Sequence, residues 1–119
     1  MSRQKTDPTI PTSIIATRLG RDVRPHSLEQ IEGEGAPQRI ALDKPELVIG
    51  RAEDAGIRLP TQRASRQHAI LKRQGADYMI RDNDSRNGVF LNGVRVHAAV
   101  LRDGDIVQVV DAVFVYREG

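Results

Sequence analysis

The chain has 119 residues, of which 39% are hydrophobic, enough for one modest core and therefore for a single small domain. Its 18 basic and 16 acidic residues give a net charge of +2, too small an excess to indicate a surface dominated by attraction to polyphosphates. Cysteine is absent, which excludes disulfides and thiolate metal sites and fits a reducing compartment, so we expect a cytoplasmic location. No apolar run approaches the roughly 18 residues that span a bilayer, so we expect no membrane association.

The first 24 residues differ in composition from the rest of the chain. Residues 1–24 are rich in Thr, Ser, Pro and charged side chains, and Pro8 and Pro11 interrupt any regular element. Such a composition cannot bury enough apolar surface to fold alone. The sequence therefore predicts a flexible tail over 1–24 and a folded domain over 25–119.

From His26 onward, short apolar runs are broken at regular intervals by Gly, Pro, Asn and Asp, which is typical of an all-β sandwich or barrel. Strands are predicted over 27–32, 38–42, 46–49, 57–59, 69–73, 77–81, 89–91, 94–97, 105–109 and 113–116. Asn92-Gly93 predicts a tight hairpin, because both central residues of such a turn must accept a positive φ. The last two runs are the richest in β-branched residues, so we expect them near the centre of a sheet.

Ser65 and His68 suggest a serine hydrolase, in which the histidine would deprotonate the serine. The surrounding sequence does not support a hydrolase, because there is no Gly-x-Ser-x-Gly turn, no identifiable acid to orient the histidine and no recognisable oxyanion hole. The preferred interpretation is that His68 hydrogen-bonds nearby backbone and braces its loop. His26, His68 and His97 are too widely separated to show metal-ligand spacing, so no metal site is expected.

The polar stretch 82–88 resembles the start of a calcium loop, but neither possible register places both the required glycine and the required glutamate correctly. No glycine-rich phosphate loop is present, so no nucleotide or other cofactor is expected. A nucleic-acid interface is also not expected, because acidic residues interrupt the basic ones and the chain has only two Tyr, two Phe and no Trp for base stacking. What remains is anion recognition by loops, since serine hydroxyls, guanidinium groups and backbone amides can together surround one phosphate group.

Five short motifs occur in order and with consistent spacing across roughly 38–116. They are Gly50-Arg51, Ser65-Arg66-x-His68-Ala69, Asp84-Ser85-Arg86-Asn87-Gly88, Asn92-Gly93 and Leu101-x-x-Gly104-Asp105. Together they resemble the forkhead-associated (FHA) domain. The resemblance implies a two-sheet β-sandwich whose loops at one end bind phosphothreonine peptides.

The resemblance also implies roles for individual residues. Arg51 and Ser65 should contact the phosphate with Arg66 beside it, Arg86 should face the phosphate or the adjoining peptide, and Asn87 should hydrogen-bond the peptide backbone. The residues expected to support the site are Gly50, His68, Gly88, Asn92 and Gly93. Among these, the glycines would permit the turns and His68 would brace the loop.

The function implied is that of a non-enzymatic, monomeric signalling adaptor without a cofactor. Its partner would be a phosphothreonine-bearing protein, either a Ser/Thr kinase or a substrate of one. The alternative from another class is an interaction module that uses the same fold independently of phosphate.

The tail offers one candidate regulatory phosphosite. In some FHA proteins a phosphorylated threonine next to the domain docks into the domain's own site, and the family often reads the residue three positions further on. Of the four tail threonines considered, Thr6, Thr9, Thr12 and Thr17, only Thr12 is followed at that distance by a large aliphatic residue, Ile15. Thr12 is therefore the predicted site.

Overall fold

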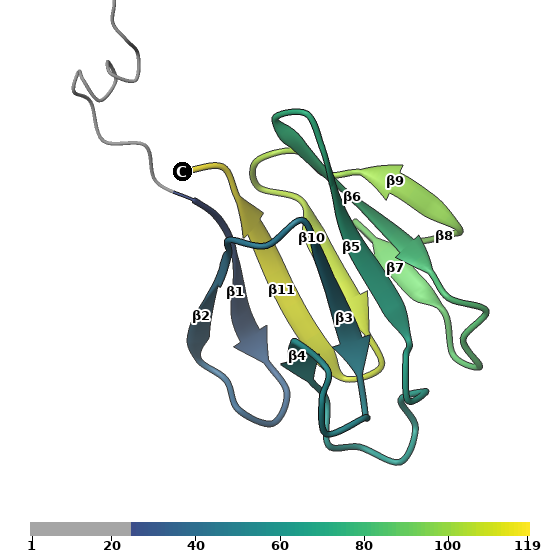
Figure 1. Ribbon diagram of the computed structural model, residues 1–119. Helices are drawn as coiled ribbons and strands as arrows, with labels where there is room; N and C mark the ends of the chain where they lie inside the picture. The colour runs from purple at the N-terminus through teal and green to yellow at the C-terminus, as the bar shows by residue number, and fades with distance from the viewer. Residues whose placement is uncertain (1–24) are drawn as a thin grey trace, which may run out of the picture.

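Two β-sheets pack face to face around one apolar core (Figure 1). The computed structural model describes residues 25–119, which form eleven strands and no helix. The strands are β1 (His26–Glu32), β2 (Gln38–Leu42), β3 (Glu46–Gly50), β4 (Ile57–Arg58), β5 (Ala69–Gln74), β6 (Asp77–Asp82), β7 (Val89–Leu91), β8 (Val94–Val96), β9 (Ala98–Val100), β10 (Ile106–Val109) and β11 (Ala112–Arg117). The predicted all-β sandwich is confirmed. The predicted tail and Thr12 lie outside the described residues.

One sheet has the strand order β2-β1-β11-β10-β7-β8 and the other has the order β4-β3-β5-β6-β9. Neighbouring strands are antiparallel except β3 and β4, which run parallel. Within this described part of the chain, no helix is long and apolar enough to cross a membrane.

The core follows the alternation that a half-buried strand imposes. In β11, Ala112, Phe114 and Tyr116 are buried between the sheets, whereas Val113 and Val115 are only half-buried. Complete burial of such a large apolar side chain contributes roughly 1.5 to 3 kcal/mol. β10 and β11 occupy the two central positions of the six-stranded sheet, as their composition predicts.

Asn92 and Gly93 form the predicted hairpin between β7 and β8, with φ angles of 50° and 84°. The Asn92 side chain also fixes this turn to β10. Its Nδ2 donates to Asp105 Oδ1 at 3.0 Å, and its Oδ1 accepts from the Ile106 N–H at 2.9 Å.

The strand β9 was not predicted, because the sequence interpretation treats 94–97 as one strand and assigns none to 98–100. In the structure β8 ends at Val96, and β9 pairs with β6 in the other sheet, Ala99 lying opposite Ile80. The chain therefore crosses between sheets at His97. No Gly, Pro, Asn or Asp marks the crossing, and alanine is a weak strand former, so only the pairing with β6 defines this strand.

Strand pairing brings three loops to one end of the sandwich. Ile49 at the end of β3 lies opposite Ala69 at the start of β5, and Ala69 lies opposite Asp82 at the end of β6. The segment after β3, the long β4–β5 loop and the β6–β7 loop therefore meet, as Figure 1 shows at the lower end of the molecule. These loops carry most of the residues that the sequence marks as candidates.

Candidate functional site

Gly50 allows the end of β3 to approach the β4–β5 loop closely. A Cβ atom at this position would lie 2.1 Å from the Arg66 carbonyl oxygen and 2.9 Å from the Ser65 carbonyl oxygen, so no larger residue fits without a backbone shift. The close approach lets the Arg51 N–H donate to the Ser65 carbonyl at 3.0 Å and the Ala52 N–H donate to the Arg66 carbonyl at 3.1 Å. The loop is thus held directly against β3.

The Arg51 side chain is half-buried and anchored at its inner end. Its Nε donates to the Ala64 carbonyl at 3.1 Å, which orients the guanidinium group. The Nη groups have no acceptor among residues 25–119, and the ion pairs within that range are Arg102–Asp77 and Arg117–Glu29. Arg51 therefore presents an oriented cation that no carboxylate within the described residues neutralises.

The Ser65 hydroxyl is oriented by the neighbouring loop. The Arg86 backbone N–H donates to Ser65 Oγ at 3.3 Å, which uses an acceptor position of the hydroxyl. No acceptor for the hydroxyl hydrogen is found among the described residues, so Ser65 is placed to donate a hydrogen bond to an anion.

His68 is fully buried and joins two loops through its ring. The Ser65 N–H donates to Nδ1 at 3.0 Å, so Nδ1 is the unprotonated nitrogen, and Nε2–H donates to the Gly88 carbonyl at 2.8 Å. Both ring nitrogens are thus engaged by backbone groups, and neither accepts the Ser65 hydroxyl proton. This geometry does not support a hydrolase in which His68 activates Ser65.

The β6–β7 loop is held by its own polar side chains, and two of them, Asp82 and Ser85, belong to quoted stretches of the sequence but were given no individual role. Ser85 is nearly buried, and its Oγ donates to Asp82 Oδ1 and accepts the Gly88 N–H at 2.8 Å. Their spacing in the sequence could have indicated this contact, because an aspartate side chain often accepts hydrogen bonds from a residue three positions later and so stabilises a turn. Gly88 has a φ of 83°, which favours glycine.

Asn87 connects the two main loops at the surface. Its Nδ2 donates to the Arg63 carbonyl at 2.7 Å, and the side chain is otherwise exposed. The second amide hydrogen and the Oδ1 atom are not used by any residue between 25 and 119. Asn87 can therefore offer one donor and one acceptor to an extended peptide.

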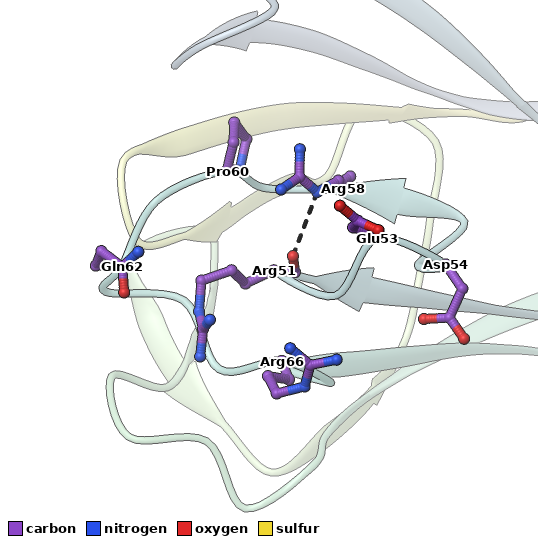
Figure 2. Close-up of a pocket in the computed structure, with 7 residues that line it drawn as sticks. All are labelled: Arg51, Glu53, Asp54, Arg58, Pro60, Gln62 and Arg66. Carbon is purple, nitrogen blue, oxygen red and sulfur yellow. Dashed lines mark hydrogen bonds between the residues drawn. The ribbon is translucent and has the colours of Figure 1, made fainter.

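An open cavity of about 550 Å³ lies beside these loops (Figure 2). It is lined by Arg51, Glu53, Asp54, Arg58, Pro60, Gln62 and Arg66. Arg51 and Arg66 are two of the sequence candidates. Arg58 was missed, although its position between buried Ile57 and Leu59 indicates a side chain that points outward from the strand.

The remaining candidates lie around or away from this cavity. Arg86 and Asn87 come from the adjacent β6–β7 loop and have exposed side chains that do not line it. Asn92 and Gly93 lie at the other end of β7 from Gly88, so the structure does not bring them to the site. No group of three or more His, Cys, Asp or Glu side chains between residues 25 and 119 could hold a metal ion.

The FHA domain family model matches residues 47–110, which include all three site loops. The chain belongs to the FHA domain family. FHA domains are typically binding modules without catalytic activity.

A curated relative is the ABC transporter ATP-binding/permease protein Rv1747 of Mycobacterium tuberculosis, which is 40% identical over 88% of this chain. Among solved structures, Mycobacterium tuberculosis EmbR in complex with a low-affinity phosphopeptide has a TM-score of 0.75 and 30% identity over 81% of this chain. A structure from an analysis of phosphothreonine-dependent FHA domain interactions has a TM-score of 0.71 and 28% identity, covering 79% of this chain and 96% of its own. The chain spans only 11% of the Rv1747 relative and 25% of the EmbR chain.

Proposed function

We propose that this FHA chain is a phosphothreonine-binding signalling adaptor and that residues 25–119 are its binding domain. The observation that carries the proposal is that the Arg51 and Arg66 guanidinium groups line one cavity at the end of the sandwich, while the adjacent loop, hydrogen-bonded to the Arg51 backbone, carries the oriented Ser65 hydroxyl. These are the donors that a phosphate group requires. A structural relative, EmbR, was solved with a phosphopeptide, which supports the same ligand class here.

Arg51 and Ser65 would bind the phosphate oxygens, and Arg66 would bind beside them. A phosphate monoester carries roughly −1.5 to −2 charge and three acceptor oxygens at neutral pH. Each charge-assisted hydrogen bond contributes about 1.5 to 3 kcal/mol, so two or three are enough to distinguish a phosphorylated ligand from an unmodified one. Because the Arg51 Nε and the Ser65 Oγ are already held by backbone groups, little ordering is required on binding.

Asn87 would hold the peptide backbone in register through its remaining donor and acceptor, with Arg86 facing the adjoining peptide. The physiological partner would then be a Ser/Thr kinase or a substrate of one, bound by a monomeric adaptor. A chain without cysteine suits a reducing compartment, so we propose that this function is exercised in the cytoplasm.

The direct test is fluorescence anisotropy with a library of phosphothreonine peptides, using unphosphorylated and phosphoserine versions of each as controls. We expect binding that requires the phosphate. Arg51→Ala should weaken it by about tenfold to a hundredfold, equivalent to about 1.4 to 2.8 kcal/mol. Arg102→Ala is the matched control, because Arg102 is an exposed arginine near Tyr78, at the end of the sandwich away from the site.

The same variant separates the proposal from its alternative. If Arg51→Ala captured its partner as well as the unmodified protein did, the fold would act as a phosphate-independent interaction module. Circular dichroism of both variants would show that each remains folded.

A further inference from the structure

Arg58 places a third guanidinium group at the cavity. It ends β4, which pairs in parallel with β3 so that Arg58 lies opposite Gly50, and the Leu59 N–H donates to the Gly50 carbonyl at 2.7 Å. The Arg58 Nε donates to the Arg51 carbonyl at 3.3 Å. Figure 2 shows this bond as a dashed line. The Arg58 guanidinium group is therefore anchored through its Nε to the backbone of a residue already assigned to the phosphate.

The direction of Arg58 separates it from the other two arginines. In Figure 2 the Arg51 and Arg66 guanidinium groups lie on one side of the Arg51 backbone, whereas the Arg58 guanidinium group lies on the other side, near Pro60. Arg58 thus points away from the side on which the Arg51 and Arg66 guanidinium groups lie.

The number of donors exceeds what one phosphate group can use. Arg51, Arg66 and the Ser65 hydroxyl already provide enough hydrogen-bond donors for three phosphate oxygens. The Arg58 Nη groups have no acceptor among residues 25–119 and no carboxylate partner within that range. When Arg51, Arg66 and Ser65 bind a phosphate, the Arg58 guanidinium group therefore still has no anionic partner within residues 25–119.

We propose that Arg58 recognises a second negative charge on the ligand. The preferred peptide would carry either a carboxylate side chain or a second phosphate near its phosphothreonine, and this specificity rests on the function proposed above. Charge-assisted hydrogen bonds from the two Nη groups of an arginine suit both chemistries.

Glu53 and Asp54 restrict where that second charge can lie. Both are exposed, both line the same cavity, and neither forms an ion pair with a residue in the described range. A ligand anion placed close to these carboxylates would be repelled. The site would therefore distinguish peptides by the position of the second charge as well as by its presence.

The test measures binding of a phosphothreonine peptide with neutral flanking residues and of variants with one glutamate at each flanking position. A second series replaces the glutamate by phosphothreonine, which distinguishes the two sources of charge. We expect one position to improve affinity about threefold to tenfold at low ionic strength, and this gain to shrink as salt is raised. Arg58→Ala should abolish the gain while leaving the neutral peptide bound within about twofold.

Charge reversal makes the test specific to this contact. Arg58→Glu should lose the gain from glutamate and favour lysine at the same peptide position, whereas the exposed control Arg102→Ala should behave as the unmodified protein. The inference is overturned if no position improves affinity, or if the gain survives in Arg58→Ala, while phosphate-dependent binding through Arg51 persists. Failure of every phosphopeptide to bind would overturn the proposed function as well.

Discussion

His68 and Gly88, 20 positions apart in the sequence, are joined by a buried hydrogen bond of 2.8 Å from the imidazole Nε2 to the carbonyl oxygen. The other ring nitrogen accepts the Ser65 N–H. One side chain therefore fixes the positions of the β4–β5 and β6–β7 loops relative to each other, although it is fully buried and does not line the cavity.

Replacing His68 by alanine should remove both hydrogen bonds and leave a cavity. We expect the free energy of unfolding to fall by about 2 to 4 kcal/mol, because a buried donor and a buried acceptor lose their partner. Differential scanning calorimetry should show a Tm lower by about 10 °C or more. His97→Ala is the control, since the His97 side chain is exposed, and its Tm should barely change. Equal Tm values for the two variants would show that His68 does not hold the loops.

Gly50 provides a test of the close approach between β3 and the β4–β5 loop. In Gly50→Ala the new Cβ would lie 2.1 Å from the Arg66 carbonyl oxygen, so the backbone must move and the two hydrogen bonds from Arg51 and Ala52 must lengthen. We expect a loss of about 1 to 3 kcal/mol in the free energy of unfolding, measured by urea denaturation, and phosphopeptide affinity reduced about tenfold or more.

The matched control for this change is Gly56→Ala. Its Cβ would lie 3.2 Å from Leu47 Cδ2, a contact that a shift of a few tenths of an ångström in this side chain relieves without moving the backbone. The urea midpoint of this variant should stay close to that of the unmodified protein. If Gly50→Ala behaved in the same way, the two backbones would not be in the tight contact described.

Local signals in the sequence were sufficient for most of the fold and for the positions of the site loops. Asn92-Gly93 predicted its hairpin because the turn depends on two adjacent residues, whereas β9 was missed because only its pairing with β6 in the other sheet defines it. The same limit applies at the site. The sequence places His68 near Ser65, but its bond to Gly88 and the direction of Arg58 depend on how distant loops pack together.

The buried phenol of Tyr116 should make the folded state less stable at alkaline pH. Burial, with smaller contributions from Glu118 and Asp77, raises the pKa of Tyr116 from 10.0 to about 12. A pKa that is higher in the folded state means that the neutral phenol is favoured by folding. Its stabilising contribution is therefore fully present below pH 10.0 and is lost as the pH rises through about 12.

The free energy of unfolding should consequently decrease between pH 10 and 12, by up to about 3 kcal/mol from this residue. Urea denaturation at a series of pH values measures the slope. In Tyr116→Phe the free energy of unfolding should fall less steeply with pH between 10 and 12. Some decrease should remain because burial also raises the pKa of Tyr78. Identical slopes for the two proteins would rule out Tyr116 as the source.

Asn87 tests whether a side chain at the loop surface holds the peptide. Its Nδ2 donates to the Arg63 carbonyl at 2.7 Å, which leaves one amide hydrogen and Oδ1 for the ligand. Asn87→Ala should reduce phosphopeptide affinity about tenfold. Asn87→Asp should reduce it further, because a carboxylate would face both the Arg63 carbonyl oxygen and the incoming phosphate. Isothermal titration calorimetry measures both losses.

Asn83 is the control that separates a direct contact from loop rigidity. It lies in the same loop and its Nδ2 also donates across to the β4–β5 loop, at 2.9 Å to the Gln67 carbonyl. Asn83→Ala therefore removes an equivalent hydrogen bond between the loops without removing the proposed peptide contact. The phosphopeptide affinity of this variant should stay within about twofold of that of the unmodified protein. If Asn83→Ala and Asn87→Ala weakened binding equally, Asn87 would act only by tying the loops together.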